Sequence, residues 1–173
     1  MQTEIQAKLR KIKQASTILR RCCTALLSLI ALAAIGLVIL LSFRVGGIDY
    51  AGITFRASDL TLGQRLLLIG MSVLRFGALF NCFYHLRQLF GNFSHEEIFT
   101  RGSVGALRRF GFGYLLWGIA SMVWDGVWFG IFANPPRPFT SHFDAFGIGA
   151  ILIAIAWFMD MAVELREENE LTI

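Results

Sequence analysis

The sequence LRQLFGNFSHEEIFTRGSVGALRRFG, residues 86–111, decides the fold of this chain because it is the one long polar interruption in the second half of a very apolar sequence. Long apolar segments stand on both sides of it. Its arginines are of the kind that orient membrane helices, since short cytoplasmic connections are enriched in Lys and Arg. The stretch therefore separates two predicted membrane helices and indicates which side their connection faces.

The composition is that of a membrane protein. Of the 173 residues, 55% are apolar and 16% are charged, compared with roughly 25% charged in soluble proteins. A membrane helix needs about 20 residues, and four segments reach that length: 22–43, 62–84, 110–133 and 143–163. The sequence therefore predicts an all-α membrane protein, a single four-span domain over residues 1–173 with a cytoplasmic loop at 86–109 and an acidic tail at 164–173.

The basic residues set the predicted orientation. They gather in the loop 86–109 and in the segment before the first span, at Lys8, Arg10, Lys11, Lys13, Arg20 and Arg21. Segments of this kind stay inside, so both termini are predicted to be cytoplasmic. This topology accounts for the formal charge of +4, and no nucleic-acid partner is expected; the lipid bilayer is the expected surrounding.

Two flanking segments have their own patterns. Residues 1–21 predict an amphipathic helix that lies on an anionic leaflet. In the connection 44–61, Ile48, Tyr50, Ile53 and Phe55 alternate with polar or small residues. Such alternation favours a short β-hairpin on the outer face.

Three charged residues lie within the predicted spans. Arg75 stands near the middle of the second span, where an ionised side chain costs from about 3 to more than 10 kcal/mol and normally has a partner. At about 1.5 Å of rise per residue, Asp125 in the third span and Asp160 in the fourth both lie within roughly 10 Å of it in depth. The sequence leaves open which of the two pairs with Arg75. Together the three form a predicted intramembrane charge cluster.

The third span carries two stripes at helical spacing. Small and polar residues predict the face toward the bundle interior: Tyr114, Gly118, Ser121 and Asp125. A neighbouring stripe predicts a lipid-facing or packing surface: Trp117, Trp124 and Trp128.

The loop 86–109 contains a helix-start signature. Ser94 and Glu97 have the spacing of a capping box, and Phe93 and Ile98 have that of a hydrophobic staple. They predict a short cytoplasmic helix that ends near residues 100–102, with Ser103 capping a second helix that runs through Arg108 and Arg109 into the third span. An apolar side of this loop is predicted at Phe90, Phe93 and Phe99.

The acidic tail is predicted to extend the fourth helix past the membrane. Its carboxylates are Glu164, Glu167, Glu168 and Glu170. They emerge on the same side as the basic loop. The sequence leaves open whether they are only solvated or pair with Arg87, Arg108 or Arg109.

The search for reactive residues gives no catalytic constellation. His85, His95 and His142 fall at different depths or outside the spans, so they do not predict a bis-histidine haem site. The sequence has no CxxC, HExxH, P-loop or GxSxG motif. We therefore expect no catalytic residues, no metal site and no cofactor, and a protein that is not an enzyme.

The loop and the C-terminus resemble one family. Leu86-Arg87-x-Leu89-Phe90, Ile98-Phe99-Thr100, Val104 and Leu107-Arg108-Arg109-Phe110-Gly111 resemble the signature of a bacterial membrane-protein family, domain of unknown function 2975. The ending at residues 165–173, LREENELTI, is similar to the usual C-terminus of that family. The resemblance implies a multi-pass protein of the bacterial cytoplasmic (inner) membrane, and it transfers no activity.

Two functions follow as hypotheses. The first is a non-enzymatic interaction or regulatory membrane protein that docks a membrane or cytoplasmic protein partner through its loop and tail. The alternative is a channel or transporter component that uses Arg75, Asp125 and Asp160. Because four spans with few polar residues make a poor path alone, the alternative requires a homo-oligomer.

Overall fold

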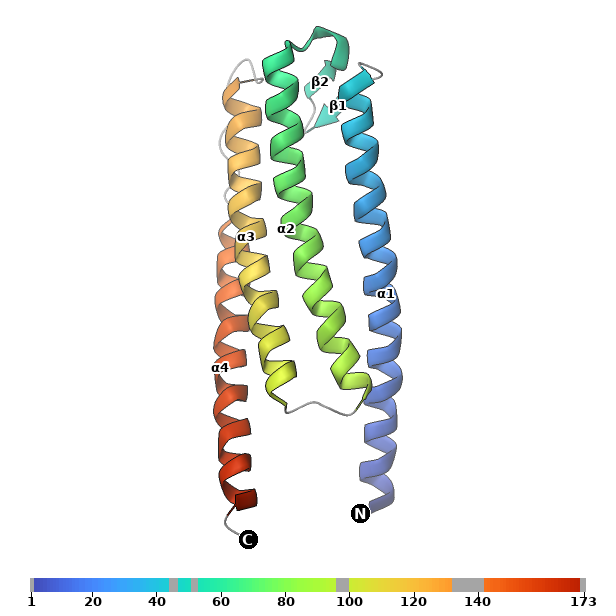
Figure 1. Cartoon of the computed structure of the whole chain (residues 1–173), viewed down its shortest axis with the longest axis vertical. Coiled ribbons are helices and arrows are strands. Elements are labelled where there is room, and N and C mark those ends of the chain that lie inside the picture. Colours follow the sequence, from blue (N-terminus) through green and yellow to red (C-terminus); the bar gives the residue numbers. More distant parts are fainter. Residues whose placement is uncertain (1, 44–46, 51–52, 96–99, 132–141, 172–173) are drawn as a thin grey trace.

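The computed structural model describes residues 2–43, 47–50, 53–95, 100–131 and 142–171. Their elements are the helix α1 (Gln2–Phe43), the strands β1 (Gly47–Tyr50) and β2 (Ile53–Arg56), the 3-10 helix η1 (Ala57–Asp59), and the helices α2 (Leu62–Ser94), α3 (Arg101–Ile131) and α4 (Phe143–Leu171). Successive helices run in opposite directions, so both termini and the α2–α3 connection lie at one end (Figure 1). We call this the loop end, and the opposite end, with β1 and β2, the hairpin end.

Each long helix packs mainly against its neighbours in sequence. The main contacts join α1 to α2, α2 to α3, and α3 to α4, and Figure 1 shows α2 and α3 between the two outer helices. A core at the hairpin end joins α1, α2 and α3 through Leu41, Leu60, Leu68, Trp124 and Trp128. A second core at the loop end joins α2, α3 and α4 through Leu89, Ala106, Leu107 and Ala156.

Three of the helices are long and apolar enough to cross a membrane. They cover Ile12–Phe43, Leu62–Ser94 and Phe143–Asn169, and they contain the predicted spans 22–43, 62–84 and 143–163. Their apolar side chains are largely exposed, as at Leu32, which is 70% exposed, and Trp157, which is 64% exposed. These helices indicate a multi-pass membrane protein. Over the described residues α3, which contains residues 110–131 of the predicted span 110–133, is not one of the three. It lies between α2 and α4.

A capping box starts α2. The Thr61 hydroxyl oxygen accepts a hydrogen bond from the Gln64 backbone N–H at 3.4 Å, and Gln64 Oε1 accepts one from the Thr61 N–H at 2.9 Å. These bonds satisfy two donors that a helix start otherwise leaves without partners. The helix begins at Leu62, where the second span was predicted to begin.

Glycine brings α3 and α4 close together. A Cβ on Gly118 would lie 2.7 Å from Cβ of Ala145. A Cβ on Gly149 would lie 3.2 Å from the backbone oxygen of Gly111 in α3. Ser121 and Asp125, which share the face of Gly118, are also buried. The prediction that this face of the third span points into the bundle is confirmed.

The predicted helix start at Ser94 is wrong. Ser94 is the last residue of α2, and its hydroxyl donates to the backbone oxygen of Gly91 at 2.6 Å. The helix α2 continues past the predicted span 62–84 because Leu89 and Phe93 pack in the loop-end core. The remainder of the predicted short helix, including Glu97, lies outside the described residues. Because α2 ends at Ser94 and α3 begins at Arg101, most of the predicted loop 86–109 is helical.

The cap of α3 also differs from its prediction. Ser103 lies inside α3, and its backbone N–H donates to the hydroxyl oxygen of Thr100 at 3.3 Å. Thr100 therefore occupies the N-cap position that was predicted for Ser103.

At the other connection, the predicted hairpin is confirmed. The strands β1 and β2 pair antiparallel, with Ile48 opposite Phe55 and Tyr50 opposite Ile53. In contrast, the separate surface helix predicted over residues 1–21 is not present: α1 is one continuous helix from Gln2 to Phe43.

Candidate functional site

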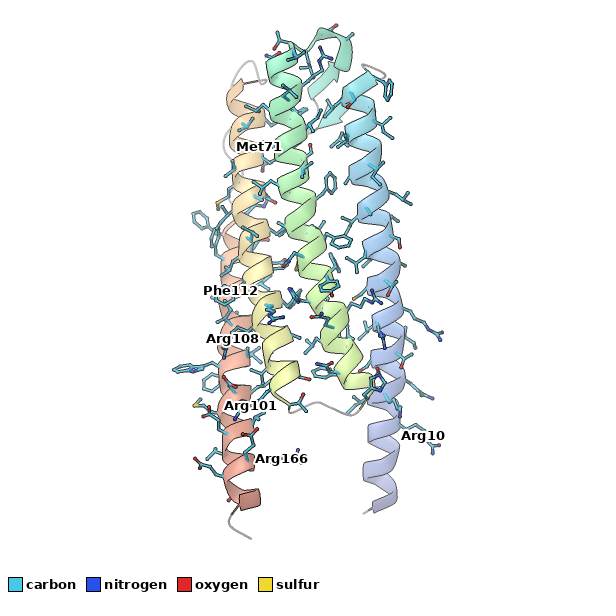
Figure 2. The ribbon with its side chains drawn as sticks, in the orientation of Figure 1. Arg10, Met71, Arg101, Arg108, Phe112 and Arg166 are labelled. Carbon is cyan, nitrogen blue, oxygen red and sulfur yellow. The ribbon has the colours of Figure 1, made fainter. Side chains whose placement is uncertain are left out.

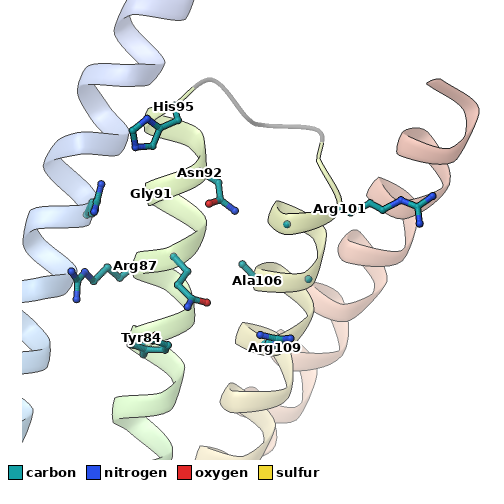
Figure 3. Close-up of a pocket in the computed structure, with 12 residues that line it drawn as sticks. Tyr84, Arg87, Gly91, Asn92, His95, Arg101, Ala106 and Arg109 are labelled. Atoms are coloured by element: carbon teal, nitrogen blue, oxygen red, sulfur yellow. The ribbon is translucent and has the colours of Figure 1, made fainter. Parts of the chain in front are cut away.

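A concave site lies at the loop end, between α1, α2 and α3. We call it the basic groove. Its volume is about 580 Å³. The basic and polar residues that line it include Arg20 of α1, Arg87, Asn92 and His95 of α2, and Arg101 and Arg109 of α3. No Asp or Glu lines it over the described residues. Figure 3 shows the groove with the loop end at the top of the view.

Three guanidinium groups of the groove have no carboxylate partner among the described residues. They belong to Arg20, Arg87 and Arg109, one from each of the three helices. In Figure 3 Arg87 points toward α1, and Arg101 turns away toward α4. Like charges brought together in this way repel one another unless an anion lies between them. The groove is therefore a site of unbalanced positive charge.

Small residues make room in the groove. Gly91, Gly102, Gly105 and Ala106 line it on the α2 and α3 sides. A Cβ placed on Gly105 would have no atom within 4 Å, and one on Gly91 would lie 3.9 Å from Nε of Arg20. The guanidinium groups of the groove therefore border a space that is open to a ligand.

On the other side of α3, two ion pairs hold α4. Arg101 donates to both carboxylate oxygens of Glu167, at 3.1 Å and 2.5 Å. About two turns further from the loop end, Arg108 donates to Asp160 at 2.7 Å. Figure 2 shows Arg101 and Arg108 along the lower part of α3, beside α4. Of the acidic tail, for which the sequence left both solvation and pairing open, Glu167 is paired, and its partner is Arg101 rather than Arg87, Arg108 or Arg109.

The hydrogen bonds from Arg101 lower the pKa of Glu167, which lies beyond the predicted span 143–163. A carboxylate with a lowered pKa stabilises the folded state above its ordinary pKa, and that contribution is lost as the pH falls through the lowered value. The link between Arg101 and Glu167 therefore holds at neutral pH and breaks in acid.

We expect Glu167→Gln to loosen the end of α4. The substitution removes the charge that holds Arg101, while the contact between Arg108 and Asp160 keeps the rest of α4 in place. Amide hydrogen exchange over residues 164–169 should become faster, and exchange over 143–158 should stay unchanged. Glu164→Gln is the matched control, because Glu164 is exposed on the same turn of α4. Equal acceleration in both variants would contradict a specific role for Glu167.

The structure describes contacts of each of the three predicted intramembrane charges. Asp160 contacts Arg108, as described above. Asp125 is 3% exposed, and its Oδ2 lies 2.9 Å from Nε2 of His142, just before α4. The guanidinium carbon of Arg75 lies 5.6 Å from the ring centroid of Trp124. Arg75 also lines a second, mainly apolar cavity of about 340 Å³.

The predicted loop residues divide into two groups. Phe93 packs against the loop-end core and Phe90 is half-buried, whereas Phe99 lies outside the described residues. Arg108 and Arg109 are exposed on the first turns of α3. Among the tail residues, Glu164 and Glu168 are exposed, and the side chain of Glu170 lies outside the described part of the chain.

Sequence reasoning did not identify Arg20, His95 and Arg101 as members of one site. A signal was present, because Arg20, Arg87 and Arg109 each stand within three residues of the end of a predicted span. Antiparallel helices bring such positions to one level. In the sequence alone, that signal indicates only the orientation of the spans.

Comparison with known families decides the classification. The family model described as "Protein of unknown function (DUF2975)" matches residues 28–173. The chain belongs to the DUF2975 family. The match includes residues 28–43 of α1 and all of α2, so DUF2975 membership extends beyond the loop and C-terminus that first indicated it. No curated protein and no solved structure matches the chain.

Proposed function

We propose that this protein is a non-enzymatic regulatory protein of the bacterial cytoplasmic membrane, and that it docks a protein partner at its loop end. In this proposal α3 is the fourth spanning helix and both termini face the cytoplasm. The distribution of Lys and Arg supports this orientation, since they cluster at the loop end on α1, α2 and α3. The DUF2975 family supplies no activity that conflicts with it.

The observation that carries the proposal is the braced end of α4. Arg101 and Arg108 of α3 hold Glu167 and Asp160 of α4. Glu164, on the same helix end, is exposed, and so is Glu168. A helix end that is held by ion pairs and still presents exposed carboxylates is ready to bind without a cost of ordering. The expected partner therefore presents a basic surface.

The proposal is tested by cross-linking in native membranes, followed by purification of the full chain and mass spectrometry. The double variant Glu164→Gln/Glu168→Gln should lose a partner that the wild type retains. Asp59→Asn is the matched control, because Asp59 is an exposed carboxylate at the hairpin end, and it should retain the partner. A partner captured equally by all three proteins, or none captured by the wild type, would refute the proposal.

One observation favours the alternative, a homo-oligomeric channel or transporter component. Asp125 is buried on α3 and contacts His142, and a buried ionisable residue within a membrane helix is typical of proton or ion paths. Proton flux into liposomes that contain the purified protein tests this function. It requires flux in the wild type that falls in Asp125→Asn and Asp160→Asn; absence of flux, or flux that neither substitution changes, would exclude it.

A further inference from the structure

We propose that the basic groove binds the phosphate group of an anionic phospholipid. The proposal does not depend on a protein partner at α4. It rests on three guanidinium groups, those of Arg20, Arg87 and Arg109, which come from three helices, line one cavity and have no carboxylate partner among the described residues. Guanidinium groups bind phosphate oxygens through pairs of parallel hydrogen bonds.

The level of these arginines along the helices indicates a lipid rather than a soluble ligand. Arg20 stands two residues before the apolar run 22–43, Arg87 three residues after the span 62–84, and Arg109 directly before the span 110–133. All three therefore lie where the apolar part of their helix ends. In a bilayer this is the level of the headgroup phosphates. Basic pockets between membrane helices at this level are typical sites for anionic headgroups.

The groove also continues away from the apolar region. His95 lies eight residues beyond Arg87 on α2, and Arg101 lies eight residues before Arg109 on α3, which is about 12 Å along each helix. Asn92 lies between these levels and offers neutral hydrogen-bonding groups. The groove therefore has room for a polar headgroup beyond the phosphate.

On the opposite side the groove meets an apolar surface. Tyr84 lines the groove and is 42% exposed, and Phe80, one turn further into the apolar part of α2, is 41% exposed. Residues four apart share one face of a helix. From the groove toward the apolar part of α2, an aromatic residue at the headgroup boundary is thus followed by an exposed apolar residue. This order suits a bound lipid whose phosphate lies at the arginines and whose acyl chain lies along Phe80.

The test is native mass spectrometry of the purified full chain in a neutral detergent, titrated with dioleoyl phosphatidylglycerol and, separately, with dioleoyl phosphatidylcholine. We expect the anionic lipid to bind at least about tenfold more tightly, and Arg20→Gln/Arg109→Gln to lose about tenfold or more of that affinity, because each substitution removes charge-assisted hydrogen bonds. The affinity should also fall with rising ionic strength.

Arg21→Gln is the matched control. Arg21 is exposed beside Arg20 but does not line the groove, so its loss should leave lipid affinity within about twofold of the wild type. An equal loss of lipid affinity in Arg21→Gln and in the double variant would refute a specific site, because the lipid would then be attracted to basic residues in general. Absence of preference for the anionic lipid would refute it as well.

Two further measurements complete the test. Sodium phosphate at the same molar concentration as the lipid, and at matched ionic strength, separates the lipid from a soluble anion. Retention of the lipid supports the proposal, because the acyl chains add to its affinity, and displacement of the lipid by an equal concentration of phosphate overturns the assignment to a lipid. Thermal unfolding without lipid should give Arg20→Gln/Arg109→Gln a midpoint no lower than that of the wild type, because the substitutions remove repulsion between like charges. If that variant unfolds, Arg20→Lys/Arg109→Lys replaces it, since Lys keeps the charge but loses the paired hydrogen bonds; unchanged lipid affinity there would contradict the proposed geometry.

Discussion

Replacing Trp128 by alanine is expected to lower the free energy of unfolding by about 3 kcal/mol, the lower end of the range for truncating a buried tryptophan. Trp128 is 1% exposed and stacks on Trp124 with 5.7 Å between ring centroids. It packs with Leu41 of α1 and Leu68 of α2. The loss is mainly one of packing contacts, because apolar helices in lipid gain little from transfer out of water. Truncation therefore leaves a cavity where three helices meet.

The measurement for Trp128→Ala is thermal unfolding of the purified protein in detergent, followed by circular dichroism. Trp157→Ala is the matched control, since Trp157 is 64% exposed on α4 and loses few protein contacts. Trp128→Phe should fall between wild type and Trp128→Ala. If the midpoints of Trp128→Ala and Trp157→Ala fell equally, the hairpin-end core would not be what holds α3 to α1 and α2.

Replacing Gly149 by alanine is expected to destabilise the protein by about 1–3 kcal/mol through overpacking. The added Cβ would lie 2.6 Å from Cδ2 of Leu115 and 3.2 Å from the backbone oxygen of Gly111. Leu115 can change rotamer, but the Gly111 oxygen belongs to the α3 backbone. The two helices must therefore move apart.

Gly147→Ala, on the same helix, is expected to change the stability in the opposite direction. A Cβ at Gly147 would meet no atom within 4 Å. Its main effect is then the helix propensity of alanine, which exceeds that of glycine by up to about 1 kcal/mol. Unfolding midpoints should fall for Gly149→Ala and rise or stay constant for Gly147→Ala. A fall of similar size in both would show that the contact between α3 and α4 is not limited by glycine.

Much of the fold could be predicted because apolar runs and their polar flanks act locally. The helices α2 and α4 begin at Leu62 and Phe143, where the apolar segments begin. The alternation at Ile48, Tyr50, Ile53 and Phe55 correctly indicated a hairpin. Each of these patterns is decided by neighbouring residues, so the rest of the fold does not override it.

Helix ends at the loop end could not be predicted from local signals. Ser94 and Glu97 fit a capping box as well as Thr61 and Gln64 do, yet only the latter pair forms one over the described residues. The difference is that Phe93 packs in the loop-end core, so α2 gains more by continuing than by stopping. Packing of this kind depends on α3 and α4, which are distant in sequence.

The pairing of charges could not be predicted because depth along a helix does not say which helices are neighbours. Asp160 and Arg75 fall at similar calculated depths, but α3 stands between α2 and α4, and Asp160 contacts Arg108 of α3 instead. For the same reason, only the arrangement of the helices shows that Arg20, Arg87 and Arg109 line one groove. The residues were evident from the sequence, whereas their association was not.

The packing of each helix against its sequence neighbours also has a consequence for how the chain is made. Because α1 needs mainly α2, α2 needs α3, and α3 needs α4, every main contact is available as soon as the next helix has left the ribosome. Chains with such local contacts fold quickly. Each helical hairpin can close in turn during synthesis, and α1 does not have to wait for α4.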